Sequence, residues 1–102
     1  MAQRNVVWTR TADRQFVGVL EYWARRNRST VYSNKLVRLV SERTKQIAAS
    51  PWAFRCTEFK NTRIAYLGSY AIFYKIREED IVISAFWDNR QDPQRLLEMF
   101  GC

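Results

Sequence analysis

The sequence predicts one α+β domain spanning residues 1–102, with helices on one side of a small sheet. Three observations predict this class. Apolar residues recur at helical spacing through residues 11–50. A short apolar run at 5–8 precedes them, and after residue 62 three runs rich in β-branched and aromatic residues follow. A chain of 102 residues has room for one hydrophobic core.

The first half predicts a strand followed by a helical hairpin. Residues 5–8 form the strand. Thr11 is the expected N-cap of the first helix, and Asp13 lies in its first turn, where a carboxylate is favourable. One face of this helix is apolar, with Phe16, Val19, Leu20 and Trp23. After the charged turn at 25–29, Ser29 or Thr30 caps a second helix, which ends before Pro51.

The second half predicts a three-stranded antiparallel meander that joins the first strand in one sheet. Its strands are Arg63–Leu67, Tyr70–Ile76 and Ile81–Trp87. The middle strand alternates, with one face carrying Tyr70, Ile72, Tyr74 and Ile76 and the other Ala71, Phe73, Lys75 and Arg77. Residues 94–100 are expected to form a short C-terminal helix.

The composition limits the partners, catalytic groups and metal sites that the protein can have. Seventeen Lys and Arg against ten Asp and Glu leave a formal charge of +7, which favours an anionic partner. There is no histidine, so histidine bases and the commonest zinc sites are excluded, and we expect neither a metal nor a cofactor. Cys56 and Cys102 could form a disulfide, but reduced thiols are the simpler interpretation. No segment suggests export or a membrane span, and we expect a cytoplasmic protein.

The order of these elements, with their local sequences, resembles the RelE/ParE superfamily of toxins from bacterial type II toxin–antitoxin systems. The resemblance covers nearly the whole chain and rests on VVWTRTADRQF, LEYWARRN, the SP pair at 50–51, TRIAYLGSYAIFYKI and IVISAFWDNRQDPQRL. It implies a growth-inhibiting, plasmid-stabilising toxin that is neutralised by a cognate antitoxin. We expect the antitoxin to offer an acidic, partly helical segment to the basic toxin.

Two activities occur on this fold. RelE-like members are metal-independent endoribonucleases that cut messenger RNA on the ribosome, and ParE-like members bind DNA gyrase. If the chain is a nuclease, the resemblance places Arg63 and Arg90 in its catalytic site, where arginine would grip phosphate. The C-terminal catalytic tyrosine of the RelE-like pattern is missing, and only a tyrosine on the sheet, such as Tyr74, or a carboxylate could replace it. Two further basic positions of the RelE-like pattern are Ala65 and Ala71 in this chain, which counts against the nuclease.

The ParE-like features are the long helical hairpin and the terminal sequence NRQDPQRLL. We therefore favour a gyrase-directed toxin, with Arg63, Arg90 and Arg95 as target-binding residues. The mRNA endonuclease is the alternative, and a domain that has lost toxicity and only binds its antitoxin is a third hypothesis. The plainest interpretation of Arg90 is a turn residue paired with Asp88 or Asp92.

Two tryptophans are expected to pack rather than to act as stacking platforms. They are Trp23, on the apolar face of the first helix, and Trp52, just after the second helix.

Overall fold

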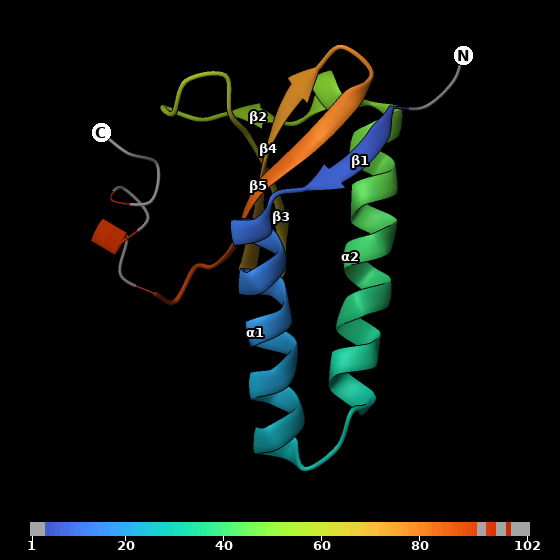
Figure 1. Cartoon of the computed structure of the whole chain (residues 1–102), viewed down its shortest axis with the longest axis vertical. Coiled ribbons are helices and arrows are strands. Elements are labelled where there is room, and N and C mark those ends of the chain that lie inside the picture. The colour runs from blue at the N-terminus through green and yellow to red at the C-terminus, as the bar shows by residue number, and fades with distance from the viewer. Residues whose placement is uncertain (1–3, 92–93, 96–97, 99–102) are drawn as a thin grey trace.

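The computed structural model describes residues 4–91, 94, 95 and 98. Its elements, in chain order, are β1 (Asn5–Trp8), α1 (Arg10–Asn27), α2 (Val31–Ala49), the 3-10 turn η1 (Pro51–Ala53), β2 (Arg55–Cys56), β3 (Arg63–Leu67), β4 (Tyr70–Arg77) and β5 (Asp80–Asp88). The predicted α+β class and helical hairpin are confirmed. In Figure 1 the two helices run side by side, and the turn that joins them lies beyond the sheet.

Within the described residues the sheet has five strands in the order β1-β5-β4-β3-β2. β3, β4 and β5 pair in the predicted antiparallel order, but β4 and β5 are longer than predicted, and β1 joins them by pairing in parallel with β5. The prediction was incomplete because it lacked β2, which adds Arg55 and Cys56 beside β3. A strand of two exposed residues carries no alternating pattern that periodicity could detect. The pairing of β4 with β5 also shifts between Phe73 and Tyr74.

The predicted N-cap of the first helix is wrong. The N-cap of α1 is Thr9 and not Thr11, since the Ala12 N–H donates to Thr9 Oγ1 at 3.1 Å and the helix already begins at Arg10. Thr9 has extended backbone angles, which is the geometry of an N-cap. At the other end Arg28 adopts a left-handed conformation, with φ of 50°, and closes the helix.

Both predicted capping residues lie at the start of α2, in different roles. Thr30 occupies the N-cap position, but its side chain accepts no backbone N–H of the helix, and Ser29 Oγ accepts the Val31 N–H at 3.2 Å.

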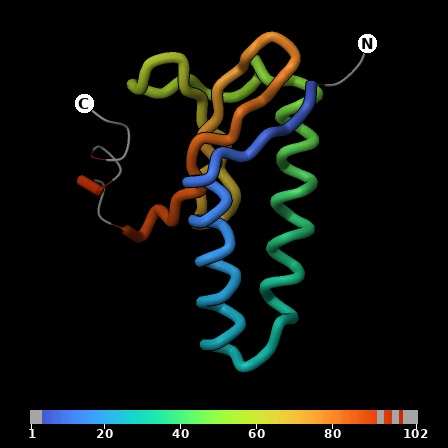
Figure 2. Tube along the Cα trace, viewed as in Figure 1, coloured from blue at the N-terminus to red at the C-terminus, as the bar shows by residue number. Residues whose placement is uncertain are grey.

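The sheet buries a different cluster on each face, as the alternation in β4 predicted. On the face that α1 and α2 cover, the largest buried side chains are Ile47, Ile72, Tyr74, Ile81, Ile83 and Phe86. The other face carries a smaller cluster made of Ile64, Ala71, Phe73, Ala85 and Trp87, against which Phe59 packs. Figure 2 shows β5 passing next to the start of α1 before it leaves the sheet.

The predicted C-terminal helix over 94–100 falls mostly outside the described residues, as do Asp92 and Cys102. Of that segment Gln94, Arg95 and Glu98 are described, and all three are exposed. No helix in the described part of the chain is long and apolar enough to cross a membrane.

Candidate functional site

Arg90 is anchored where β5 leaves the sheet. Its Nε donates to Asp88 Oδ1 at 2.9 Å, and its Nη2 donates to Asp88 Oδ2 at 2.8 Å. The Arg90 backbone N–H also donates to Asp88 Oδ1, at 2.9 Å. One carboxylate therefore holds both the backbone and the guanidinium of Arg90 in a two-point arrangement. The predicted pairing of Arg90 with Asp88 is confirmed.

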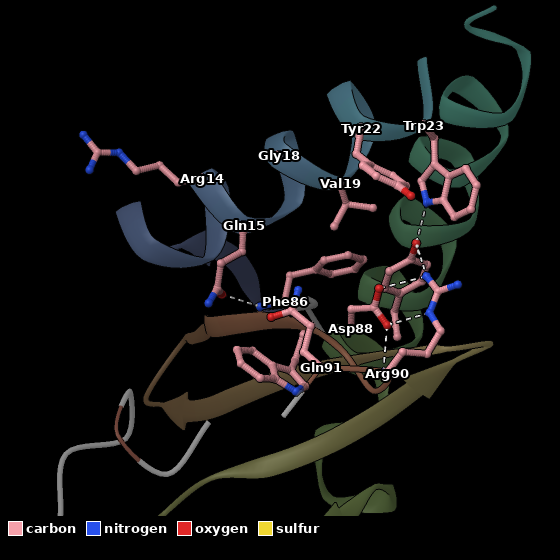
Figure 3. Close-up of a pocket in the computed structure, with 12 residues that line it drawn as sticks. Arg14, Gln15, Gly18, Val19, Tyr22, Trp23, Phe86, Asp88, Arg90 and Gln91 are labelled. Carbon is pink, nitrogen blue, oxygen red and sulfur yellow. Dashed lines mark hydrogen bonds and ion pairs between the residues drawn. The ribbon is translucent and has the colours of Figure 1, made fainter. Parts of the chain in front are cut away.

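Two aromatic side chains complete the anchor. The carbon of the Arg90 guanidinium lies 5.8 Å from the ring centroid of Trp23 and 5.8 Å from that of Tyr70. The Trp23 Nε1–H donates to Tyr70 Oη at 2.8 Å, and Arg90 Nη2 approaches the same oxygen at 3.4 Å. We call Trp23, Tyr70, Asp88 and Arg90 the arginine clamp; Figure 3 shows its bonds. Trp23 packs as predicted, yet it also orients the phenol that Arg90 contacts.

The clamp holds a cation that is still available to a partner. The Arg90 side chain is 55% exposed, whereas that of Asp88 is 17% exposed. The hydrogen bond from Arg90 lowers the pKa of the Asp88 carboxyl, and the Asp88 carboxylate in turn raises the pKa of Arg90. Burial raises the pKa of the Tyr70 phenol, which stays neutral. At neutral pH the clamp is thus a fixed ion pair beside a neutral phenol.

A groove of about 510 Å³ runs from the clamp along α1. Its floor is Phe86, whose backbone N–H donates to Gln15 Oε1 at 2.9 Å. Tyr22 lines one side and is 49% exposed, while the Arg14 side chain points away from the clamp (Figure 3). Beside Gly18 there is open space. The groove therefore offers aromatic surface next to an oriented guanidinium.

The other predicted catalytic residues lie elsewhere, and both hold the segment after α2. Arg63 Nη1 donates to the carbonyl oxygens of Phe54 at 2.6 Å and Trp52 at 3.3 Å. Tyr74 is fully buried, and its Oη donates to the Pro51 carbonyl oxygen at 2.7 Å. Burial raises the pKa of the Tyr74 phenol to about 12.

Arg63 and Arg90 are not brought together. Arg63 pairs with Tyr74, whereas Tyr70, at the start of the same strand, pairs with Asp88 of the clamp. Tyr70 and Tyr74 are four positions apart along β4, about 13 Å. Arg95, the third predicted target-binding residue, is exposed.

The two alanines that replace basic residues of the RelE-like pattern are both in the core. Ala65 is 1% exposed and Ala71 is 0% exposed. They lie on opposite faces of the sheet, since Ala65 packs with the helix-covered cluster and Ala71 with the other. Neither position can present a side chain to RNA in this arrangement.

The fold and the clamp define the class: a basic α+β domain with a helical hairpin over a small sheet and an arginine at the end of the last strand, which is the architecture of RelE/ParE toxins. The model of the ParE toxin family, of the type II toxin–antitoxin system parDE, matches residues 6–93. The chain belongs to the ParE toxin family.

A solved structure described as the chromosomal ParDE toxin–antitoxin system from P. aeruginosa has the same fold. Its TM-score is 0.70 at 18% identity, over 82% of this chain and 94% of the other. No curated protein matches the chain significantly.

Proposed function

We propose that this chain is the toxin of a type II module in the cytoplasm, that it acts by binding DNA gyrase, and that it does not cleave RNA. The burial of Tyr74 carries the proposal. Cleavage by the ribose 2′-hydroxyl needs a group that takes its proton and one that protonates the leaving oxygen. The Tyr74 hydroxyl is 0% exposed, donates to Pro51, and has a pKa of about 12, so it can do neither.

Tyr70 cannot take that role either. Its Oη already accepts from Trp23 and contacts Arg90, the residue is 3% exposed, and burial raises its pKa. The chain has no histidine, and the carboxylate bonded to Arg90, that of Asp88, accepts three hydrogen bonds from Arg90 and has a lowered pKa, which makes it a weak base. An arginine alone positions a phosphate but moves no proton.

The same geometry suits recognition of a protein. Arginine and aromatic side chains held in fixed positions are the commonest energetic centres of protein interfaces. The clamp fixes the Arg90 guanidinium before any partner arrives, which lowers the entropy lost on binding. Asp88 occupies Nε and Nη2, and Nη1 donates to no other described residue. We infer that this nitrogen meets an acceptor on gyrase.

A different surface fits the antitoxin. A groove of about 370 Å³ lies between α1, α2 and β1. Its apolar lining includes Trp8, Phe16 and Val37, and Val37 is 44% exposed. An amphipathic helix buries its apolar side in such a groove, and acidic residues on that helix would be attracted to a chain of charge +7. We therefore place the helical segment of the cognate antitoxin here, and neutralisation follows from this complex.

The decisive experiment induces the toxin in bacteria without its antitoxin and follows DNA damage and translation together. We expect growth arrest with an SOS response and intact messages, and inhibition of supercoiling by purified gyrase. Cleavage of messenger RNA in the ribosomal A site would reject this proposal in favour of the nuclease. Normal growth with retained antitoxin binding would show that toxicity has been lost.

A further inference from the structure

Trp52 lies at the other end of β4 from the arginine clamp, and the expectation that it packs is wrong. It is 64% exposed. Pro51, the first residue of η1, is buried, and the tight turn after it directs the next side chain outward. One large indole is thus held at the surface by a short, well-anchored turn, whose Pro51 carbonyl accepts from Tyr74.

A fixed cation supports this indole. The carbon of the Arg63 guanidinium lies 5.1 Å from the centroid of the Trp52 ring. Arg63 cannot swing away easily, because it donates to the carbonyl oxygens of Trp52 and Phe54. The contact between the cation and the ring orients the indole while most of its surface remains open to solvent.

The groove beside Trp52 is strongly basic. Its volume is about 540 Å³, and its lining holds four cations, Lys60, Arg63, Lys75 and Arg77, against a single carboxylate, Glu58. None of these five forms an ion pair within the described part of the chain, where the one pair found is Arg90–Asp88. The groove therefore combines uncompensated positive charge with an exposed aromatic ring.

We propose that this surface, made of Trp52, Lys60, Arg63, Lys75 and Arg77, binds single-stranded nucleic acid. An unpaired base would stack on the indole, and Lys60, Lys75 and Arg77 would meet the phosphates that follow. Stacking platforms flanked by cations are the usual means of binding a single strand without reading its sequence. An acidic peptide would satisfy the charges but leaves the ring without a stacking partner, and a duplex hides the faces of its bases.

The proposal does not depend on the target of the toxin, because the surface lies apart from the clamp. It is tested with the purified full-length toxin and fluorescein-labelled 15-mers of deoxythymidine and of uridine, by anisotropy across a salt series. We expect Trp52→Ala to weaken binding by at least about five-fold, the loss of one stacked base. Trp52→Phe should recover most of that loss, since phenylalanine keeps an aromatic face.

Charge is tested with matched double variants. Lys60→Glu with Arg77→Glu changes the groove, and Arg26→Glu with Arg38→Glu makes the same change in net charge on exposed positions of the helical hairpin. The first pair should lower the slope of log affinity against log salt by about 1.4, the value for two lost phosphate contacts. The second pair should leave the slope nearly unchanged. Circular dichroism confirms that each variant is folded.

Three outcomes would overturn the proposal: equal weakening by the two double variants, wild-type binding by Trp52→Ala, or tighter binding of a 15-residue polyglutamate than of either oligonucleotide. Binding of the DNA or of the RNA oligomer through Trp52 supports it, and comparing the two identifies the preferred sugar. Inhibition of gyrase by Trp52→Ala should match wild type, so a failed gyrase assay and a failed nucleic-acid assay can be told apart.

Discussion

The substitution Tyr74→Phe tests whether the role of Tyr74 is structural or catalytic. The substitution keeps the ring in the core and removes only the hydroxyl that donates to the Pro51 carbonyl oxygen at 2.7 Å. Both residues are buried, so water does not replace the lost donor freely. Leaving a buried acceptor without its donor costs about 1–3 kcal/mol of folding free energy. For a domain of this size that corresponds to a fall in melting temperature of about 5–20 °C.

The raised pKa of Tyr74 makes the stability of the folded protein depend on pH in the alkaline range. The pKa of the phenol is about 12 in the folded protein against an ordinary 10.0. The folded state therefore keeps the proton over a range in which the unfolded chain releases it. The stability that Tyr74 contributes is fully present below pH 10 and is lost as the pH rises towards 12. The difference in unfolding free energy between wild type and Tyr74→Phe should shrink across this window.

The assay combines thermal melts across pH with induction in bacteria. Tyr66→Phe is the matched control, because Tyr66 lies on the neighbouring strand β3 and is 50% exposed. We expect Tyr74→Phe to be less stable and still toxic below its melting temperature, and Tyr66→Phe to match wild type. A Tyr74→Phe protein that melts like wild type but has lost toxicity would refute the reasoning, since its hydroxyl would then act in chemistry and not in packing.

Three further predictions concern the arginine clamp and the groove proposed for the antitoxin. Arg90→Ala should weaken gyrase inhibition by at least about 30-fold. It should cost little stability, because the Arg90 side chain is 55% exposed. Arg26→Ala is the control, and equal inhibition of gyrase by the two variants would mean that Arg90 does not bind the target. The lowered pKa of Asp88 means that its stabilisation is present above the ordinary value of 3.8 and is lost as the pH falls through the folded value. Chemical unfolding should therefore show a shallower loss of stability in acid for Asp88→Asn than for wild type, and identical acid limbs would contradict the role of the ion pair. Val37→Glu should weaken antitoxin binding at least about ten-fold by calorimetry, whereas Val31→Glu, at a 76% exposed position outside the groove, should not. Equal affinities of these two variants would move the antitoxin to another surface.

The elements that periodicity predicted well are those whose own residues carry the pattern. β1 and β3 have the predicted bounds, and the alternation along β4 correctly divided its side chains between two clusters. The N-cap was placed two residues late because Thr9 and Thr11 are both good capping residues, and only the extended backbone of Thr9 distinguishes them. β2 was missed because its two residues form a strand only through their pairing with β3.

Only part of the candidate site could be predicted from the sequence. The Arg90–Asp88 pair lies within two residues, and the sequence predicted an ion pair of Arg90 with Asp88 or Asp92. Trp23 and Tyr70, which complete the clamp, are 47 residues apart in sequence, and no local pattern links them. Their contact requires the C-terminal part of α1 to approach the start of β4, where Phe86 stacks on Tyr70 with ring centroids 5.1 Å apart.

By itself the sequence determined the class of fold, the lack of histidine chemistry and the basic charge, since these follow from composition and from the two backbone periods of 3.6 and 2 residues. Tertiary structure alone decided which side chains are accessible. Tyr74, a candidate for catalysis, is buried against Pro51, and Trp52, expected to pack, lies at the surface on Arg63. Exposure depends on strand register and on where the chain turns after a helix, and both are set by contacts between residues distant in sequence.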